Sequence, residues 1–123
     1  MFRYKLSQLK SIAGSLSTTI KPPYSVILQG NLGAGKTTFA KFFLQPILLK
    51  KNQTVVSPTF TIINTYETTK GVVWHADLYR LNDESELIEL GLIEFAHGGI
   101  TIIEWADIIE PYITDVPKTV IEL

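Results

Sequence analysis

The sequence contains no cysteine, which excludes disulfide bonds and thiolate metal sites. It has no basic excess either, since 11 Lys and Arg against 12 Asp and Glu give a formal net charge of −1. We therefore expect no direct, tight binding to a nucleic-acid backbone. No apolar run approaches the roughly 18 residues of a membrane span, and no apolar core of a secretion signal is present. These absences predict a cytoplasmic protein with no membrane partner.

The composition that is present is typical of one folded domain. Apolar residues make up 46% of the chain and charged residues 19%, a balance found in globular rather than disordered proteins. A chain of 123 residues can bury enough surface for a single hydrophobic core. We predict one domain that spans residues 1–123.

Apolar patterns alternate between strand and helix periods along the chain. The helix period predicts one helix capped at Ser7 and another over residues 36–44. An acidic start at 82–84 predicts a third helix, which Gly91 ends. Compact apolar or β-branched runs predict strands at 2–6, 25–29, 54–56, 60–67, 72–78, 100–105 and 119–123. The runs on either side of Lys70-Gly71 predict an antiparallel hairpin.

Residues 30–37, Gly-Asn-Leu-Gly-Ala-Gly-Lys-Thr, match the phosphate-binding pattern G-x-x-x-x-G-K-[ST] between a strand and a helix. Glycines let the backbone approach phosphates, and successive N–H groups at a helix start hold the β-phosphate. In this motif Lys36 contacts the β- and γ-phosphates and the Thr37 hydroxyl binds Mg²⁺. We expect ATP or ADP with Mg²⁺, bound by Asn31, Leu32, Gly33, Ala34, Gly35, Lys36, Thr37 and Thr38. For Thr38, a local capping role is an equal alternative.

The loop and the alternating elements together predict the fold class. It is an α/β, P-loop NTPase-like three-layer sandwich with a mostly parallel central sheet and an antiparallel hairpin addition. In such a sheet the ligand binds at the carboxyl ends of the strands.

A P-loop site also needs an acidic residue at the end of an apolar strand, where it holds Mg²⁺ or its water. Glu104 ends the run 100–104, and Asp77 ends the run 72–77. Spacing favours Glu104 over Asp77, and for both a surface carboxylate at a strand end is the alternative. His75 by itself is more typical of a structural residue.

Four segments, taken together, resemble the TsaE (YjeE) family of bacterial P-loop ATPases. They are residues 30–39, Ser-Pro-Thr-Phe at 57–60, His-Ala-Asp-Leu-Tyr-Arg-Leu at 75–81, and Glu-Trp-Ala-Asp at 104–107. The P-loop alone is unspecific, whereas the four segments in this order are much more specific. That family acts in the threonylcarbamoyladenosine modification of tRNA. Its relatives commonly continue past the position of Leu123 into a further strand.

The resemblance implies roles for individual residues. Lys36 and Thr37 would hold phosphate and Mg²⁺, and Glu104 would be the second metal-side group. Thr59 would contact the γ-phosphate region from a switch-like segment, and Asp77 would assist hydrolysis or couple it to a partner. The implied partner is the TsaB–TsaD complex, which transfers the threonylcarbamoyl group while the ATPase supports repeated turnover.

Three alternatives remain open at this stage. A small-molecule or nucleotide kinase shares the P-loop but needs cationic groups that clamp the moving phosphoryl, and the only arginines are Arg3 and Arg80. A GTP-dependent switch is disfavoured, because no Asn-Lys-x-Asp stretch is present to recognise guanine. The third is a nucleotide-binding regulatory module without useful catalysis, since P-loop proteins can hydrolyse slowly until a partner completes the site.

Overall fold

A five-stranded sheet forms the centre of the computed structural model, which describes residues 6–30 and 33–123. The strands are β1 (Tyr24–Gln29), β2 (Ile63–Thr68), β3 (Gly71–Asp77), β4 (Ile100–Glu104) and β5 (Lys118–Glu122). Their order across the sheet is β2-β3-β4-β1-β5. The strands β3, β4, β1 and β5 run parallel, and β2 pairs antiparallel with β3. The predicted parallel sheet with an added hairpin is confirmed.

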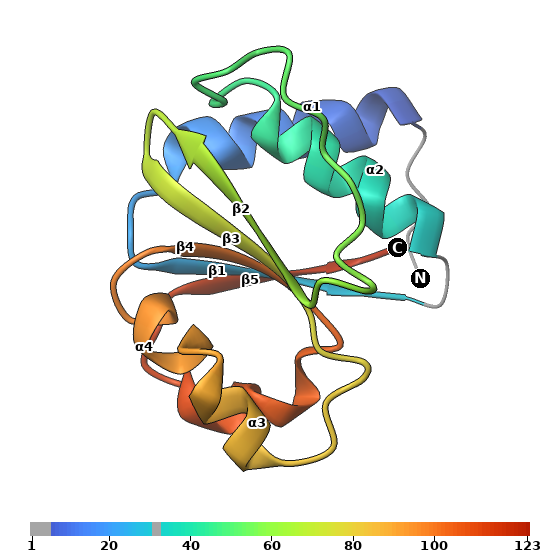
Figure 1. Ribbon diagram of the computed structural model, residues 1–123. Coiled ribbons are helices and arrows are strands. Elements are labelled where there is room, and N and C mark those ends of the chain that lie inside the picture. The colour runs from blue at the N-terminus through green and yellow to red at the C-terminus, as the bar shows by residue number, and fades with distance from the viewer. Residues whose placement is uncertain (1–5, 31–32) are drawn as a thin grey trace.

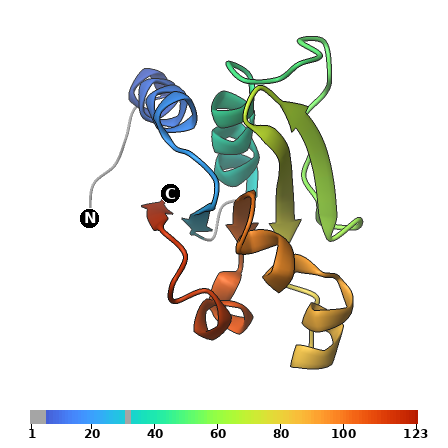
Figure 2. The same cartoon turned by 90° about the vertical axis from the view of Figure 1, so that its left-hand side faces the viewer.

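Helices cover both faces of this sheet and complete three layers (Figure 1). One face carries α1 (Leu6–Thr19) and α2 (Gly33–Leu44), which lie side by side in Figure 2. The other face carries α3 (Glu84–Glu89), α4 (Leu92–Ala96) and the short 3-10 helices η1 (Ala106–Ile108) and η2 (Glu110–Tyr112). None of the helices within the described ranges is long and apolar enough to cross a bilayer.

Two hydrophobic cores form because alternate strand residues point to opposite faces. Ile100 and Ile102 of β4 pack in the core beneath α1 and α2, together with Phe39. Ile103 packs on the opposite face with Leu92. All five residues of β4 are buried, as expected for a parallel strand covered on both sides. The same alternation places the side chain of Glu104, two positions after Ile102, on the α2 face.

Several sequence predictions of local structure are confirmed. The third helix begins at Asp83, whose side chain accepts a hydrogen bond from the Glu86 N–H at 3.2 Å. Gly91 ends this segment with a φ of 75° and leads directly into α4. The hairpin turns at Gly71, with a φ of 93°. These features depend on neighbours in the sequence, which is why local patterns predict them.

Two predicted helix boundaries were wrong. α1 is already helical at Leu6, so Ser7 lies inside the helix and is not its cap. The rest of the strand predicted at 2–6 lies outside the described residues. α2 begins at Gly33, three positions before its predicted start, because Gly33 and Gly35 of the loop are part of the helix.

The strand predicted at 54–56 does not form. The backbone of Val56 pairs with side chains instead, because its N–H donates to the Tyr66 hydroxyl at 3.3 Å and its carbonyl accepts from the Asn64 amide at 3.2 Å. These bonds occupy the groups that a sheet partner would need. The segment therefore contacts β2 through side chains and remains irregular.

His97 joins the end of α4 to the loop before β5. Its Nδ1 lies 2.9 Å from the carbonyl oxygen of Ile93, and its Nε2 lies 2.9 Å from Oδ1 of Asp115. Both partners are acceptors, so only the protonated imidazole can donate to both. The Ile93 carbonyl first, and then Asp115, raise the pKa of His97 above its ordinary value of 6.5.

This raised pKa predicts a pH-dependent stability. Because the pKa is higher in the folded state, the stabilisation is fully present below the unfolded-state pKa and is lost as pH rises through the folded-state pKa. We expect His97→Gln to lower Tm more at about pH 5.5 than at about pH 8.5. Thermal denaturation followed by circular dichroism measures this difference. An equal loss at both pH values would contradict the assignment.

Candidate functional site

The glycine loop lies at the carboxyl edge of the parallel strands, where β1 ends and α2 begins. Asn31 and Leu32 lie outside the described residues, so their predicted ligand contacts stay predictions. The first four N–H groups of α2, from Gly33 to Lys36, precede the intrahelical hydrogen-bond pattern and carry the positive end of the helix dipole. Thr37 and Thr38 follow in the helix and are half-buried. This arrangement suits a phosphate group.

Gly30 is required at the entry to the loop by both conformation and space. Its φ is 137°, and a Cβ added there would lie 2.5 Å from the backbone oxygen of Leu123. We expect Gly30→Ala to destabilise the fold by about 1–3 kcal/mol, the usual cost of a strained backbone residue. Gly98→Ala is the matched control, since its Cβ would meet open space. Urea denaturation of both variants measures the difference, and equal stability of the two would contradict this reasoning.

Lys36 is buried near the start of α2, with a relative exposure of 3%. Its Nζ lies 4.3 Å from the centroid of the Trp105 ring, an attractive cation–π distance. Trp105 has a φ of 56° and is itself in contact with Tyr79, with ring centroids 4.9 Å apart. Strained backbone of this kind clusters at functional sites. The lysine is therefore held close to the end of β4.

Asp77 and Glu104 lie beside each other at the ends of β3 and β4. The parallel register pairs them directly, and it also pairs Glu104 with Leu28 of β1, the strand that leads into the glycine loop. Both carboxylates are on the α2 face, since each follows a residue of that core by an even number of positions. Oδ1 of Asp77 accepts from the Tyr79 N–H at 3.0 Å. The structure thus brings Lys36, Asp77 and Glu104 together at one edge.

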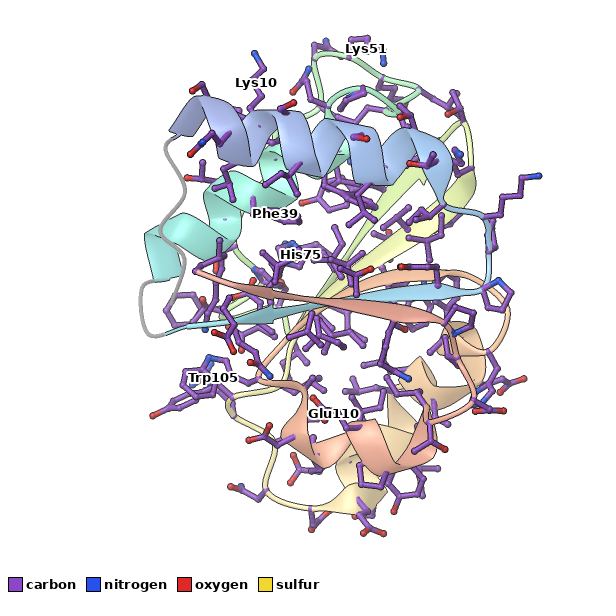
Figure 3. The ribbon with its side chains drawn as sticks, turned by 180° about the vertical axis from the view of Figure 1, so that it is seen from behind. Lys10, Phe39, Lys51, His75, Trp105 and Glu110 are labelled. Carbon is purple, nitrogen blue, oxygen red and sulfur yellow. The ribbon has the colours of Figure 1, made fainter. Side chains whose placement is uncertain are left out.

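The carboxylate of Glu104 is tied to a buried histidine. Nε2 of His75 lies 2.7 Å from Oε2 of Glu104, and the side chains are 0% and 4% exposed. Figure 3 shows His75 between the sheet and α2, with Trp105 at the end of the sheet where α2 begins. Sequence reasoning missed this partnership. The two-residue spacing of His75 and Asp77 places both on one face of β3, but it does not indicate Glu104 as the partner.

Thr59 lies in the connection between α2 and β2. Its hydroxyl is 2.7 Å from Oγ of Ser57 and pairs there rather than with Lys36, Asp77 or Glu104. The neighbouring Phe60 is 84% exposed, and the Arg80 guanidinium lies 5.5 Å from its ring centroid. The motifs at 57–60 and 75–81 therefore lie side by side. The predicted contact of Thr59 with the γ-phosphate region stays a prediction.

The donor atoms at this edge fit a hard cation. Carboxylate oxygens of Asp77 and Glu104 and the hydroxyl of Thr37 are the oxygen ligands that Mg²⁺ prefers. Within residues 6–30 and 33–123, no group of three or more His, Cys, Asp or Glu could hold a metal on its own. Mg²⁺ is usually bound by one or two carboxylates together with substrate phosphates and water, and Asp77 and Glu104 supply two carboxylates here.

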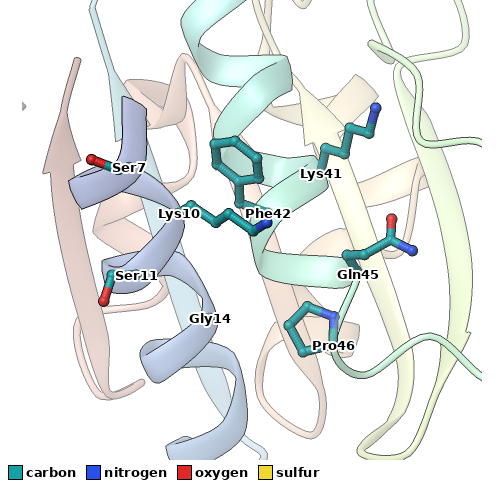
Figure 4. Close-up of a pocket in the computed structure, with 8 residues that line it drawn as sticks. All are labelled: Ser7, Lys10, Ser11, Gly14, Lys41, Phe42, Gln45 and Pro46. Carbon is teal, nitrogen blue, oxygen red and sulfur yellow. The ribbon is translucent and has the colours of Figure 1, made fainter. Parts of the chain in front are cut away.

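A separate groove lies between α1 and α2 (Figure 4). Its volume is about 690 Å³, and its lining residues are Ser7, Lys10, Ser11, Gly14, Lys41, Phe42, Gln45 and Pro46. None of the predicted site residues lines it. The phosphate site and this groove are distinct regions of the molecule.

The three-layer fold and its loop define a P-loop NTPase-like α/β protein. A sequence profile described as "Threonylcarbamoyl adenosine biosynthesis protein TsaE" matches residues 4–123. The chain belongs to the TsaE family, which is a family of tRNA threonylcarbamoyladenosine biosynthesis.

Individual relatives agree with this membership. The tRNA threonylcarbamoyladenosine biosynthesis protein TsaE of Bacillus subtilis is 44% identical over 104 residues, which cover 84% of this chain and 63% of that protein. The protein of the same name from Rickettsia bellii is 40% identical over 103 residues, 84% of this chain and 71% of the relative. The crystal structure of Bacillus subtilis YdiB is similar with a TM-score of 0.66 at 33% identity, covering 98% of this chain and 73% of that one. The chain thus matches about two thirds of the length of these relatives.

Proposed function

We propose that this protein binds ATP with Mg²⁺ at residues 30–38 and hydrolyses it in support of the threonylcarbamoyladenosine modification of tRNA. The proposed partner is a complex of the TsaB–TsaD type. One observation carries the proposal: buried Lys36 lies at the start of α2 beside a strand edge where Asp77 and Glu104 are paired in register. A cation at a helix start beside two carboxylates is the set of groups that a magnesium triphosphate needs.

Each group has a distinct task in this proposal. The N–H groups of residues 33–36 and the ammonium of Lys36 bind the phosphate oxygens. Thr37 and Glu104 hold Mg²⁺, which neutralises negative charge on the phosphates when it is bound. Asp77 orients the attacking water or couples hydrolysis to the partner. ADP then occupies the same residues as the product.

The surface beside the loop supports a protein partner. The motifs at 57–60, 75–81 and 104–107 each contain one exposed aromatic side chain, with exposures of 84% for Phe60, 68% for Tyr79 and 41% for Trp105. Exposed aromatic residues are enriched at protein interfaces. The net charge of −1 supports a protein partner over direct binding of tRNA.

A nucleotide-dependent regulatory module is a second candidate. The observation that favours it is the pairing of Thr59 with Ser57, because this hydroxyl bonds within its own segment and not to Lys36 or Glu104. A site that is incomplete in the isolated chain would hydrolyse ATP slowly, so that nucleotide-dependent docking could be the essential event.

Steady-state ATP hydrolysis tests the proposal, measured for the protein alone and with the TsaB–TsaD pair from the same source. We expect a low rate alone, a higher rate with the pair, and no activity of the Lys36→Ala variant in either case. If ATP strengthens binding of the protein to the TsaB–TsaD pair but the pair does not raise the rate of hydrolysis, the regulatory module is favoured. A phosphorylated product formed with a nucleoside acceptor would instead indicate a kinase.

A further inference from the structure

The proposed function assigns no role to His75, although this side chain is fully buried beside the site. It lies on β3, opposite Ile102 of β4, and Glu104 follows Ile102 by two positions. The two side chains therefore meet diagonally across neighbouring strands on the α2 face. Their 2.7 Å contact joins Nε2 of His75 to Oε2 of Glu104.

The hydrogen bonding of His75 is directed at Glu104 alone. In the part of the chain that the structure describes, Nδ1 of His75 is the one buried side-chain nitrogen or oxygen without a hydrogen-bond partner. An unpaired buried polar atom is destabilising, and an apolar residue at this position would avoid that cost. Packing alone therefore does not account for a histidine here, whereas its bond to the carboxylate does.

Burial keeps the His75 and Glu104 side chains paired with each other. Glu104 has a relative exposure of 3% and His75 of 0%, so neither side chain can exchange its partner for bulk water without opening the core. Since a carboxylate only accepts, Nε2–H is the donor. One oxygen of Glu104 is thus committed to the imidazole, and the other remains for chemistry at the phosphate edge.

We propose that His75 is a positioning residue that fixes the carboxylate of Glu104 for Mg²⁺. This inference rests on the proposed function, because it needs Glu104 to serve the metal. Partners that orient a metal-side group commonly change metal affinity by about 10–100-fold when they are removed. His75 acts through Glu104 and needs no contact with the nucleotide.

Calorimetric titration of ADP over a series of Mg²⁺ concentrations tests this role without requiring turnover. For His75→Leu we expect the Mg²⁺ concentration that gives half-maximal enhancement of ADP binding to rise about 10–100-fold. Binding of ADP without Mg²⁺ should stay unchanged. His75→Gln should restore the Mg²⁺ dependence to within a few-fold, because its amide N–H can replace Nε2–H.

A double-mutant comparison separates positioning from a general structural role. In a Glu104→Gln background, adding His75→Leu should not shift the Mg²⁺ dependence further. An equal further shift in that background, or an unchanged Mg²⁺ dependence in the single His75→Leu variant, would overturn the inference. Wild-type protein that binds ADP with no Mg²⁺ dependence would instead contradict the proposed function.

A second pair of variants covers the case in which His75→Leu does not fold. Where thermal denaturation shows that His75→Leu is unfolded, His75→Asn takes its place beside His75→Gln. The shorter amide of asparagine cannot reach Oε2 of Glu104, so we expect only His75→Asn to require more Mg²⁺. The same Mg²⁺ requirement for both amides would overturn the positioning role.

Discussion

Lys36→Ala is expected to raise the Kd for ATP by at least about 100-fold. Lys36 is buried near the start of α2, and its ammonium group lies 4.3 Å from the centroid of the Trp105 ring. This places it beside the proposed phosphate site. Hydrogen bonds to charged groups contribute about 1.5–3 kcal/mol each, and a lysine in this motif bridges two phosphates. Equilibrium titration with a fluorescent ATP analogue measures the loss.

Lys41→Ala provides the matched control for this experiment. It removes the same charge from the same helix, but Lys41 is exposed in the last turn and belongs to the separate groove. We expect its Kd to stay within about twofold of wild type, since Lys41 is exposed and its charge is screened by salt. Equal losses in both variants would show that general charge, and not the position of Lys36, accounts for binding.

Glu104→Gln is expected to lower the Mg²⁺-dependent rate of ATP hydrolysis by at least about 100-fold. Stabilisation of the transition state by a bound metal is worth several kcal/mol, and the substitution removes the charge while keeping the size of the side chain. Nucleotide binding should change much less, because the N–H groups of α2 and Lys36 remain. Hydrolysis rates and Kd values measured on the same preparation separate the two effects.

The control for this substitution is Glu122→Gln. Glu122 also ends a parallel strand, since it pairs with Gln29 at the end of β1. Unlike Glu104, it is exposed. Its hydrolysis rate should match that of the wild type. An unchanged rate in Glu104→Gln would remove Glu104 from the metal side and leave Asp77 as the carboxylate to test.

His75 connects these predictions to the fold. The imidazole that donates to Oε2 of Glu104 belongs to β3 and is fully buried between the sheet and α2. Loss of the core packing and loss of carboxylate orientation are therefore separate consequences of one substitution. The amide variants distinguish them, because glutamine and asparagine differ in reach and share the same polar group.

The sequence by itself determined the parts of this protein that depend on neighbours along the chain. The glycine loop between a strand and a helix, the Asp83 cap and the hairpin at Gly71 each lie within a short window. Glycine geometry, capping and alternating apolar residues act at that range, so reading them needs no tertiary contact. The family resemblance also depends on such local segments in a fixed order.

Only the tertiary structure decided how distant segments meet. The pairing of Asp77 with Glu104 follows from the register of two parallel strands, and a shift of one residue would turn these side chains to the other face. His75 and Glu104 are 29 positions apart, so no local pattern fixes their 2.7 Å contact. The segment at 54–56 has strand-forming residues, yet side chains of β2 occupy the backbone N–H and carbonyl of Val56, which a neighbouring strand would need. Propensity acts on each residue separately, whereas register and competition for hydrogen bonds depend on the assembled sheet.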